Sequence, residues 1–328
     1  MTHPAVEEIY LALSDDLQAV NRILAETAAS RLEFITRALD RPLAQGGKRL
    51  RPLMVLLSAR AVDESPPPAT VEIAAAAEAI HIAALLLDDV IDNAQVRRGQ
   101  DTLAKEWGHE VPVLLADYIF ARTCARLAQN DFPRPLAALA ATTTRMVEGE
   151  LIEILNRHNF DLSEPQYLAI IEGKTATLFS ACCQAGALVA GAGPALAETF
   201  ARAGLNFGIA FQIVDDLLDF LGEEQLLGKR PGQDLACGRV TLPLIHALRC
   251  APHEHRLRFE HLLRATQEPG ARLAHALAFI KEYGGFDYAR SLAQRYSEEA
   301  AAAFASLPAS PARESLLTLT EYALRRPA

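Results

Sequence analysis

The chain has 328 residues, of which 50% are hydrophobic and 6% aromatic, enough apolar material for one large core. Lysine and arginine together number 32 against 41 aspartates and glutamates, which gives a net charge of -9. Because nucleic acids and anionic membranes repel a negatively charged chain, this balance argues against both as general partners. A local basic pocket for a phosphorylated small molecule remains compatible with it.

The cysteines and the N-terminus bear on location. Five cysteines without a CxxC pair fit the reduced thiols of a cytosolic protein. The opening residues MTHPAVEEIY lack the basic segment and apolar core that mark a signal peptide. No uninterrupted apolar run reaches about 18 residues, the length that indicates a spanning helix. We therefore expect a cytoplasmic protein with no transmembrane segment.

Helical periodicity dominates the chain, and its many alanines and leucines favour helices over strands. The expected helices span residues 5–40, 50–62, 70–92, 111–128, 135–157, 164–190, 196–221, 240–249 and several segments from 255 onwards. Short breaks rich in proline, glycine and polar residues separate them, and no repeat of fixed period is visible. These patterns predict one all-α domain over residues 1–328.

Two DDxxD motifs follow long apolar helical runs, LLLDDVID (85–92) and FQIVDDLLDF (211–220). Their acids are Asp88, Asp89 and Asp92 in the first motif, and Asp215, Asp216 and Asp219 in the second. In each motif the first and third acids share a helix face, and the second is displaced by about 100°. Such a face suits Mg²⁺, which prefers oxygen ligands. Solvated helix ends would explain one motif alone, but two motifs on separate helices favour metal binding.

The first acid face continues backwards along its helix. Glu78, His81 and Leu85 step towards Asp88 by three and four residues, so all four lie near one face. A lone buried histidine is usually structural. Because His81 shares a stripe with metal-type acids, we favour a contact with a ligand.

Basic residues form a second set, most of them close to a glycine. They are Lys48 and Arg51 in AQGGKRLRP, Arg97 and Arg98 before Gly99, Lys174 beside Thr175 in EGKTATLF, and Lys229 and Arg239 in LGKRPGQDLACGRVTLP. Taken singly, each is an ordinary surface charge. Glycine beside such clusters indicates close backbone approach or a movable loop. Because arginine binds phosphate bidentately and lysine acts as a point charge, the set suits diphosphate groups.

At this point the order and spacing of the motifs become informative. With GGKRLRP, EAIHIAALLLDDVIDNAQVRRG, GKTATLF, FQIVDDLLD and GKRPGQDLACGRVTLP, the chain resembles the trans-isoprenyl diphosphate synthases of the polyprenyl synthetase family. The match runs from about residue 40 to near the C-terminus, where GGFDYARSLAQRY (284–296) also fits. The resemblance implies an isoprenoid-synthase fold, a single large bundle of long antiparallel helices around a central cavity, assembled as a homodimer.

The resemblance also implies roles for the residues. Asp88, Asp92 and Asp215 would bind Mg²⁺, with Asp89, Asp216 and Asp219 supporting the two sites. Lys48, Arg51, His81 and Arg98 would hold the homoallylic substrate, isopentenyl diphosphate. Arg97, Lys174, Thr175, Gln212 and Lys229 would hold the allylic prenyl diphosphate. About three Mg²⁺ ions would serve each active site, completed by substrate phosphate and water.

Three positions depart from the family pattern. Arg239 stands where the family usually has lysine, and it keeps the charge. Leu87 replaces a histidine common before the first acid pair, and Arg230 replaces a proline. None of these removes a metal ligand or phosphate contact on which the assignment depends.

The implied mechanism needs no side-chain nucleophile, and no Ser-His-Asp or Cys-His arrangement is evident. The basic residues, together with the metal ions, stabilise the charge that develops on the allylic diphosphate, so that its C–O bond ionises. The double bond of isopentenyl diphosphate then attacks the allylic cation. A proton leaves to the departing diphosphate.

Product length depends on what lies beneath the metal site. Ala83 and Ala84 lie about one helical turn before Asp88, roughly 6 Å along the axis, beside the expected path of the growing chain. In the family, bulky aromatics here stop growth early, and bacterial short-chain enzymes carry a two-residue insertion in the first motif. This chain has neither, so we expect a long-chain, octaprenyl-type product. The alternative is a farnesyl or geranylgeranyl diphosphate synthase closed by Phe120 or Phe132.

Three other classes share part of the pattern. Glu78-x-x-His81 has the spacing of a di-iron carboxylate bundle, but such sites need a second copy and no convincing one occurs. A non-catalytic subunit of a heteromeric synthase is expected to lose acids or basic contacts, whereas both acid motifs are complete. A terpene cyclase shares one DDxxD motif, but its reaction does not require the basic motif GGKRLRP. The site residues therefore favour the synthase.

Overall fold

The computed structural model describes residues 4–44, 47–97, 99–129, 133–222, 231–266 and 268–325. The first helices are α1 (Pro4–Ala12), α2 (Ser14–Ala28), α3 (Glu33–Ala44), α4 (Leu50–Val62), α5 (Ala69–Ile91), α6 (Leu103–Trp107), α7 (Glu110–Gln129) and α8 (Pro133–Leu155). Then follow α9 (Glu164–Ile171), the π-helix η1 (Glu172–Ala176), α10 (Thr177–Val189), α11 (Pro194–Leu221), α13 (Gln233–Ala236), α14 (Leu242–Cys250), α15 (His253–Ala265), α16 (Pro269–Glu282), α17 (Gly285–Ala305) and α18 (Pro311–Leu324). Strands β1 (Val96–Arg97) and β2 (Gln100–Asp101) form a short antiparallel hairpin after α5.

The all-α prediction is confirmed, and most of the expected helices begin and end within a few residues of their predicted limits. The single helix expected over residues 5–40 is wrong, because that stretch forms α1, α2 and most of α3. Ala29 is extended, and the Thr36 hydroxyl accepts a hydrogen bond from the backbone N–H of Ser30 at 3.1 Å. The Ser30 hydroxyl accepts in turn from the Leu32 N–H. These side-chain bonds replace helix bonds, which is why the helix breaks there.

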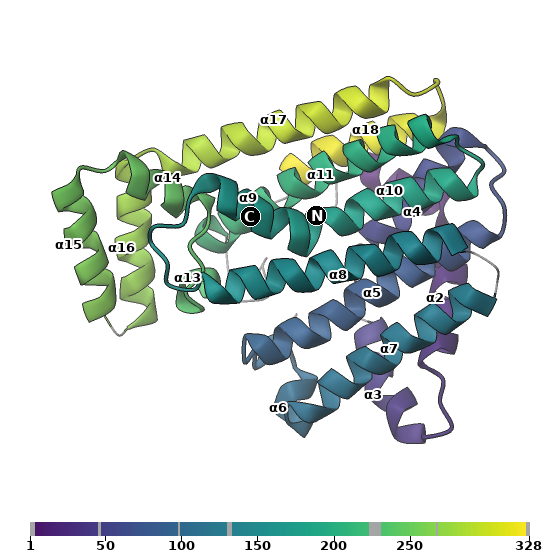
Figure 1. Ribbon diagram of the computed structural model, residues 1–328, viewed down its shortest axis with the longest axis horizontal. Helices are drawn as coiled ribbons and strands as arrows, with labels where there is room; N and C mark the ends of the chain where they lie inside the picture. The colour runs from purple at the N-terminus through teal and green to yellow at the C-terminus, as the bar shows by residue number, and fades with distance from the viewer. Residues whose placement is uncertain are drawn as a thin grey trace.

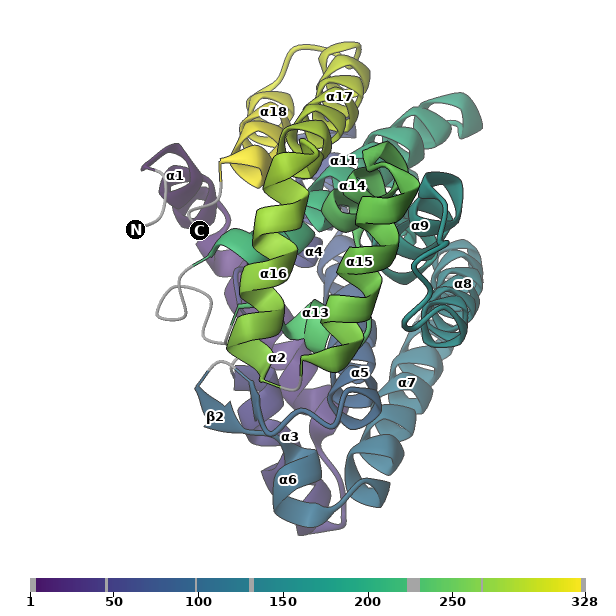
Figure 2. The same ribbon diagram turned by 90° about the vertical axis from the view of Figure 1, so that its left-hand side faces the viewer.

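Long helices run side by side across the molecule, with α5, α7 and α8 on one side and α17 and α18 on another (Figure 1). Between them α10 packs against both α4 and α11. The approach of α11 to α10 is very close, because a Cβ at Gly204 would lie 2.5 Å from the carbonyl oxygen of Phe179. Only glycine permits this contact between helix backbones. The α15–α16 pair stands apart from these helices, towards the viewer in Figure 2.

Two clusters of buried apolar side chains form the core, and α11 and α17 pass through both. On α11, Phe207 belongs to the first cluster and Ile213 to the second. On α17, Phe304 belongs to the first and Leu292 to the second. Because the same two helices supply both clusters, the structure supports our proposal that residues 1–328 form one domain.

Helix α5 is unusually apolar for its length. By length and composition α5 could cross a membrane, but 67% of its apolar window is buried inside the protein. Its buried face includes alanines 74–77 and 79, whose small side chains let α4 and α7 pack closely. This burial is typical of a core helix, and α5 ends at the first acid motif.

Candidate active site

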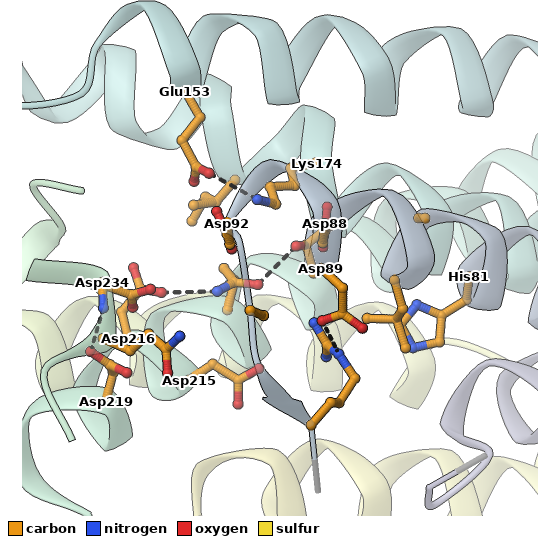
Figure 3. A pocket seen from close by; sticks show the side chains of 18 of the residues that line it. His81, Asp88, Asp89, Asp92, Glu153, Lys174, Asp215, Asp216, Asp219 and Asp234 are labelled. Atoms are coloured by element: carbon orange, nitrogen blue, oxygen red, sulfur yellow. Dashed lines mark hydrogen bonds and ion pairs between the residues drawn. The ribbon is translucent and has the colours of Figure 1, made fainter. Parts of the chain in front are cut away.

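A cavity of about 710 Å³ opens at the ends of α5 and α11, and it gathers the predicted site residues. It is lined by Lys48, Arg51, His81, Asp88, Asp89, Asp92, Arg97, Lys174, Thr175, Gln212, Asp215, Asp216, Asp219 and Arg239. Figure 3 shows the acids of the two motifs projecting from α5 and α11 into this space. Arg98, Lys229 and Arg230 lie outside the described residues.

Arginines hold two acids of the first motif. Arg97 lies in strand β1, shortly after the end of α5, and its Nε donates to Asp89 Oδ1 at 2.6 Å. Asp92 follows the last residue of α5 and accepts hydrogen bonds from two arginines. The guanidinium of Arg239 reaches both of its oxygens at 2.5 Å, and Arg157 reaches one at 3.0 Å. Asp92 is therefore ion-paired where we predicted a metal ligand.

In the second motif, two acids are fixed by uncharged donors. Asp216 is buried and accepts from Tyr167 Oη at 2.6 Å and from Gln212 Nε2 at 2.9 Å. Burial, followed by the charge of Asp234, raises the pKa of Asp216. Asp219 is buried as well and accepts from the backbone N–H of Asp234 at 3.0 Å, which ties α13 to α11. Asp215 lines the cavity beside them.

A π-helical turn brings Lys174 to the acids. A Cβ at Gly149 would lie 2.6 Å from the backbone nitrogen of Lys174, so glycine lets α8 touch η1. Lys174 Nζ thereby reaches Glu150 at 2.6 Å and Glu153 at 2.8 Å. Burial would lower the pKa of Lys174, but Asp88 and Glu153 outweigh it and the pKa is raised. The ammonium group is therefore charged at neutral pH, beside the first acid motif.

Arg239 is held by carboxylates from three parts of the chain. Besides Asp92, it donates to Glu153 at 2.9 Å and to Asp234 at 3.1 Å. Glu153 thus accepts from both Lys174 and Arg239 through the same oxygen, Oε2. Figure 3 shows the bond to Lys174. Charge-assisted bonds of this kind fix the direction of both cations.

The other basic residues line the cavity from α4 and the residues before it. Arg51 lies over the Phe179 ring, 4.7 Å from its centroid, and Lys48 donates to the hydroxyl of Tyr322 in α18. Neighbouring Arg49 turns inwards and pairs with Glu78 at 2.9 Å, and both side chains are less than 10% exposed. Because Glu78 is committed to Arg49, the structure gives no support to the di-iron alternative.

The described residues fit Mg²⁺ by the chemistry of their donor set. Carboxylate oxygens of Asp88, Asp92 and Asp215 line one cavity, and Mg²⁺ prefers oxygen ligands. Within the described part of the chain, no group of three histidine, cysteine or acidic side chains lies close enough to hold an ion. Bound Mg²⁺ usually keeps water and substrate phosphate among its ligands, so an incomplete protein site is compatible with it. The metal assignment of the six acids stays a prediction.

Several residues of the site escaped the sequence analysis. Asp234 stands inside a motif singled out for its lysine and arginine, and its acid could have been noted there. Glu150 and Glu153 are three residues apart, a spacing that predicts one shared helix face. Arg157 and Tyr167 carry no local signal, because only the packing of α8 and α9 brings them to the acids.

Together, fold and site define a class of protein. It is an all-α chain whose central cavity sets carboxylates suited to a divalent cation beside cations suited to phosphate.

Comparison with known proteins then identifies the family. The sequence profile of the polyprenyl synthetase family matches residues 32–280. Heptaprenyl diphosphate synthase component 2 of Geobacillus stearothermophilus is 36% identical over 98% of this chain and 99% of its own length. Octaprenyl diphosphate synthase of Escherichia coli is 33% identical over 98% of this chain and 99% of its own. A crystal structure of a Caulobacter crescentus polyprenyl synthase, complexed with calcium and isoprenyl diphosphate, is similar with a TM-score of 0.93 and 36% identity, covering 98% of each chain. The chain belongs to the polyprenyl synthetase family, so the resemblance seen in its motifs is confirmed.

Proposed function

We propose that the chain is a Mg²⁺-dependent prenyltransferase that condenses isopentenyl diphosphate head-to-tail with an allylic prenyl diphosphate. Its product is a long-chain trans-polyprenyl diphosphate. The observation that carries this proposal is the shared cavity: both acid motifs line the same space as Lys174 and Arg239. Divalent cation and diphosphate are complementary to these two sets of charges.

The chain's own residues supply most of the chemistry. Lys174 and Arg239 stabilise the charge that develops on the leaving diphosphate, and their carboxylate partners hold them in place before it arrives. When bound, Mg²⁺ supplies further positive charge to the same leaving group. Apolar residues, among them Leu85, Met146 and Phe211, line the cavity and exclude water from the allylic cation. The departing diphosphate takes the proton released after the new bond forms.

The proposal divides the cations between two phosphate sites, as the family resemblance implies. In this proposal isopentenyl diphosphate is held by Lys48, which precedes α4, by Arg51 of α4, by His81 of α5, and by Arg98, which lies outside the described residues. Arg97, Lys174, Thr175, Gln212, Arg239 and Lys229 hold the allylic diphosphate. Arg51→Ala should raise the apparent KM for isopentenyl diphosphate more than for the allylic substrate. Lys229→Ala should do the reverse and also lower kcat, since the proposal assigns Lys229 to the leaving diphosphate. The same substrate dependence in both variants would refute this division.

The long-chain product is supported by a small residue in the lining of the cavity. Ala84 lines the cavity, whereas Ala83 is buried in the core. Phe120 is partly buried against the core, and Phe132 lies outside the described residues. The small side chain of Ala84 therefore leaves room beneath the first acid motif.

We also propose a homodimer, formed through α7 and α8. Leu114 on α7 is 66% exposed and Leu155 on α8 is 82% exposed, and Val147 and Leu151 continue the apolar surface along α8. A large exposed apolar patch usually marks an interface, and two-fold dimers are the commonest assemblies. Leu151→Glu together with Leu155→Glu should shift sedimentation from dimer to monomer. A dimer that survives both changes would refute this surface.

We also propose a cytoplasmic location. All five cysteines are free, which fits the reducing cytoplasm.

A heteromer is the alternative assembly, because the Geobacillus relative is named as one component of a synthase. Expressing the chain alone with Mg²⁺, isopentenyl diphosphate and allylic primers tests both function and assembly. Inactivity with every primer would favour a non-catalytic subunit.

A further inference from the structure

A buried chain of hydrogen bonds connects three elements beneath the allylic end of the cavity. Tyr167 of α9 donates to Asp216 Oδ2 at 2.6 Å, and Gln212 Nε2 donates to Asp216 Oδ1 at 2.9 Å. Thr175 of η1 donates to Gln212 Oε1 at 2.8 Å. Tyr167, Asp216 and Thr175 are buried, and all four residues line the cavity. Tyr167 has no role in the proposed reaction so far.

The geometry gives each of these bonds its direction. The hydroxyl of Tyr167 and the amide NH₂ of Gln212 both donate to oxygens of Asp216. The Gln212 carbonyl oxygen must then point the other way, where the Thr175 hydroxyl donates to it. An amide NH₂ has two hydrogens, and Asp216 accepts one of them. The second is left to donate to an anion in the cavity.

Removal of the Tyr167 hydroxyl would weaken the chain of hydrogen bonds at its first donor. Asp216 would keep one uncharged donor instead of two, and its carboxylate could rotate within the space left by the missing oxygen. The Gln212 amide would then lose its fixed acceptor, and the Thr175 hydroxyl would lose its fixed partner. A donor that must reorganise when its ligand arrives binds more weakly than one already in place.

We propose that Tyr167 is a positioning residue that, through Asp216, orients the Gln212 amide towards the allylic diphosphate. The identity of that ligand rests on the proposed function, whereas the orienting role rests on the bonds themselves. The effect falls on one substrate, because Lys48, Arg51 and His81 lie outside this chain of bonds. Loss of one hydrogen bond to a charged group corresponds to roughly tenfold to a hundredfold in affinity.

The test compares Tyr167→Phe with Tyr288→Phe. Tyr288 donates to Glu164 at 2.6 Å, the same length as the Tyr167 bond, but lies outside the cavity lining. Tyr167→Phe should lower kcat/KM for the allylic substrate about tenfold or more and leave the KM for isopentenyl diphosphate within about twofold. Tyr288→Phe should change neither. An equal effect of Tyr167→Phe on both substrates, or none on either, would overturn the proposal.

A double-mutant cycle with Thr175→Val separates positioning from general stability. If Tyr167 acts through the Gln212 amide, Tyr167→Phe and Thr175→Val together should cost little more than the worse single change. Additive losses would show that Tyr167 acts independently, against the proposal. Should Tyr167→Phe fail to fold, Thr175→Ser and Thr175→Val test the same amide from its other side. The serine variant keeps the donor, so equal allylic KM values in the two would refute the fixed orientation.

Binding of inorganic pyrophosphate with Mg²⁺, measured by calorimetry, distinguishes this proposal from the proposed function. Tyr167→Phe should weaken that binding about tenfold relative to the wild type and to Tyr288→Phe. If the wild type elongates no primer but pyrophosphate binding shows this loss, the positioning role stands and the proposed function fails. Equal binding in all three proteins overturns the positioning role, whatever the wild type elongates.

Discussion

Asp92 can serve a metal ion only if its arginine partners release it. Arg157 reaches the carboxylate at 3.0 Å and is 25% exposed, and this is the ion pair it makes with the first acid motif. Arg239 also holds Asp92, but it pairs with Glu153 and Asp234 as well. Removing Arg239 would take a charged partner from three carboxylates at once, those of Asp92, Glu153 and Asp234. Arg157→Gln is therefore the cleaner perturbation.

The expected magnitude follows from this contact. A hydrogen bond between charged groups contributes about 1.5–3 kcal/mol, and the partial exposure of Arg157 places its contribution at the lower end. A divalent cation that displaces Arg157 from Asp92 must overcome this energy. Without the arginine, binding should tighten by about 1.4 kcal/mol, which is roughly tenfold. The loss of the positive charge of Arg157 also lowers the repulsion of a divalent cation, which tightens its binding further.

The assay is Mn²⁺ binding to the substrate-free protein, followed by the electron paramagnetic resonance signal of the free ion. Arg256→Gln is the matched control, because Arg256 is 27% exposed and ion-paired with Asp161 and Glu260, away from the cavity lining. Arg157→Gln should bind Mn²⁺ more tightly than the wild type, and Arg256→Gln should bind it equally. Equal or weaker binding by Arg157→Gln would refute the competition between Arg157 and the metal ion for Asp92.

Three further predictions concern catalysis, product length and stability. Asp215→Ala should lower turnover about a hundredfold or more while the helical circular dichroism stays unchanged, because Asp215 lines the cavity as a candidate metal ligand. Ala84→Phe should shorten the product, seen by chromatography after dephosphorylation, because an aromatic ring cannot share a packed channel with the chain. The matched change Ala83→Phe should instead overpack the core and cost about 1–3 kcal/mol of unfolding free energy. Glu78→Ala should lower the free energy of unfolding in urea by about 3–5 kcal/mol, because it leaves Arg49 buried without its carboxylate.

Each of these has an outcome that contradicts it. Near-normal turnover of Asp215→Ala would remove the second metal assignment. If Ala84→Phe and the wild type give the same product length, the floor of the cavity lies elsewhere. A Glu78→Ala variant as stable as the wild type would mean that the Arg49 pair contributes nothing net to the fold.

The two acid motifs could be predicted because each depends on helical periodicity alone. Asp88 and Asp92 share a face by spacing, and the apolar run before them predicts a buried helix. The partners of Asp92 could not be predicted in this way. Arg157 and Arg239 reach it across 65 and 147 residues of sequence, and only packing brings them there.

The errors have several physical origins. Continuous apolar periodicity predicted one helix over residues 5–40, but local side-chain bonds around Ser30 outweigh it. The short β1–β2 hairpin was not expected, since two-residue strands leave no alternating pattern. Tyr167 was missed because its function depends on a buried bond to another helix, and nothing in its neighbouring residues indicates that bond.

Elongation by the isolated chain tests the central claim most directly. The purified protein is incubated with labelled isopentenyl diphosphate and farnesyl diphosphate, with Mg²⁺ or with a chelator, and the products are dephosphorylated and sized. We expect long-chain polyprenols with Mg²⁺ and none with the chelator. A folded protein that consumes no isopentenyl diphosphate with this or any other allylic primer would contradict it.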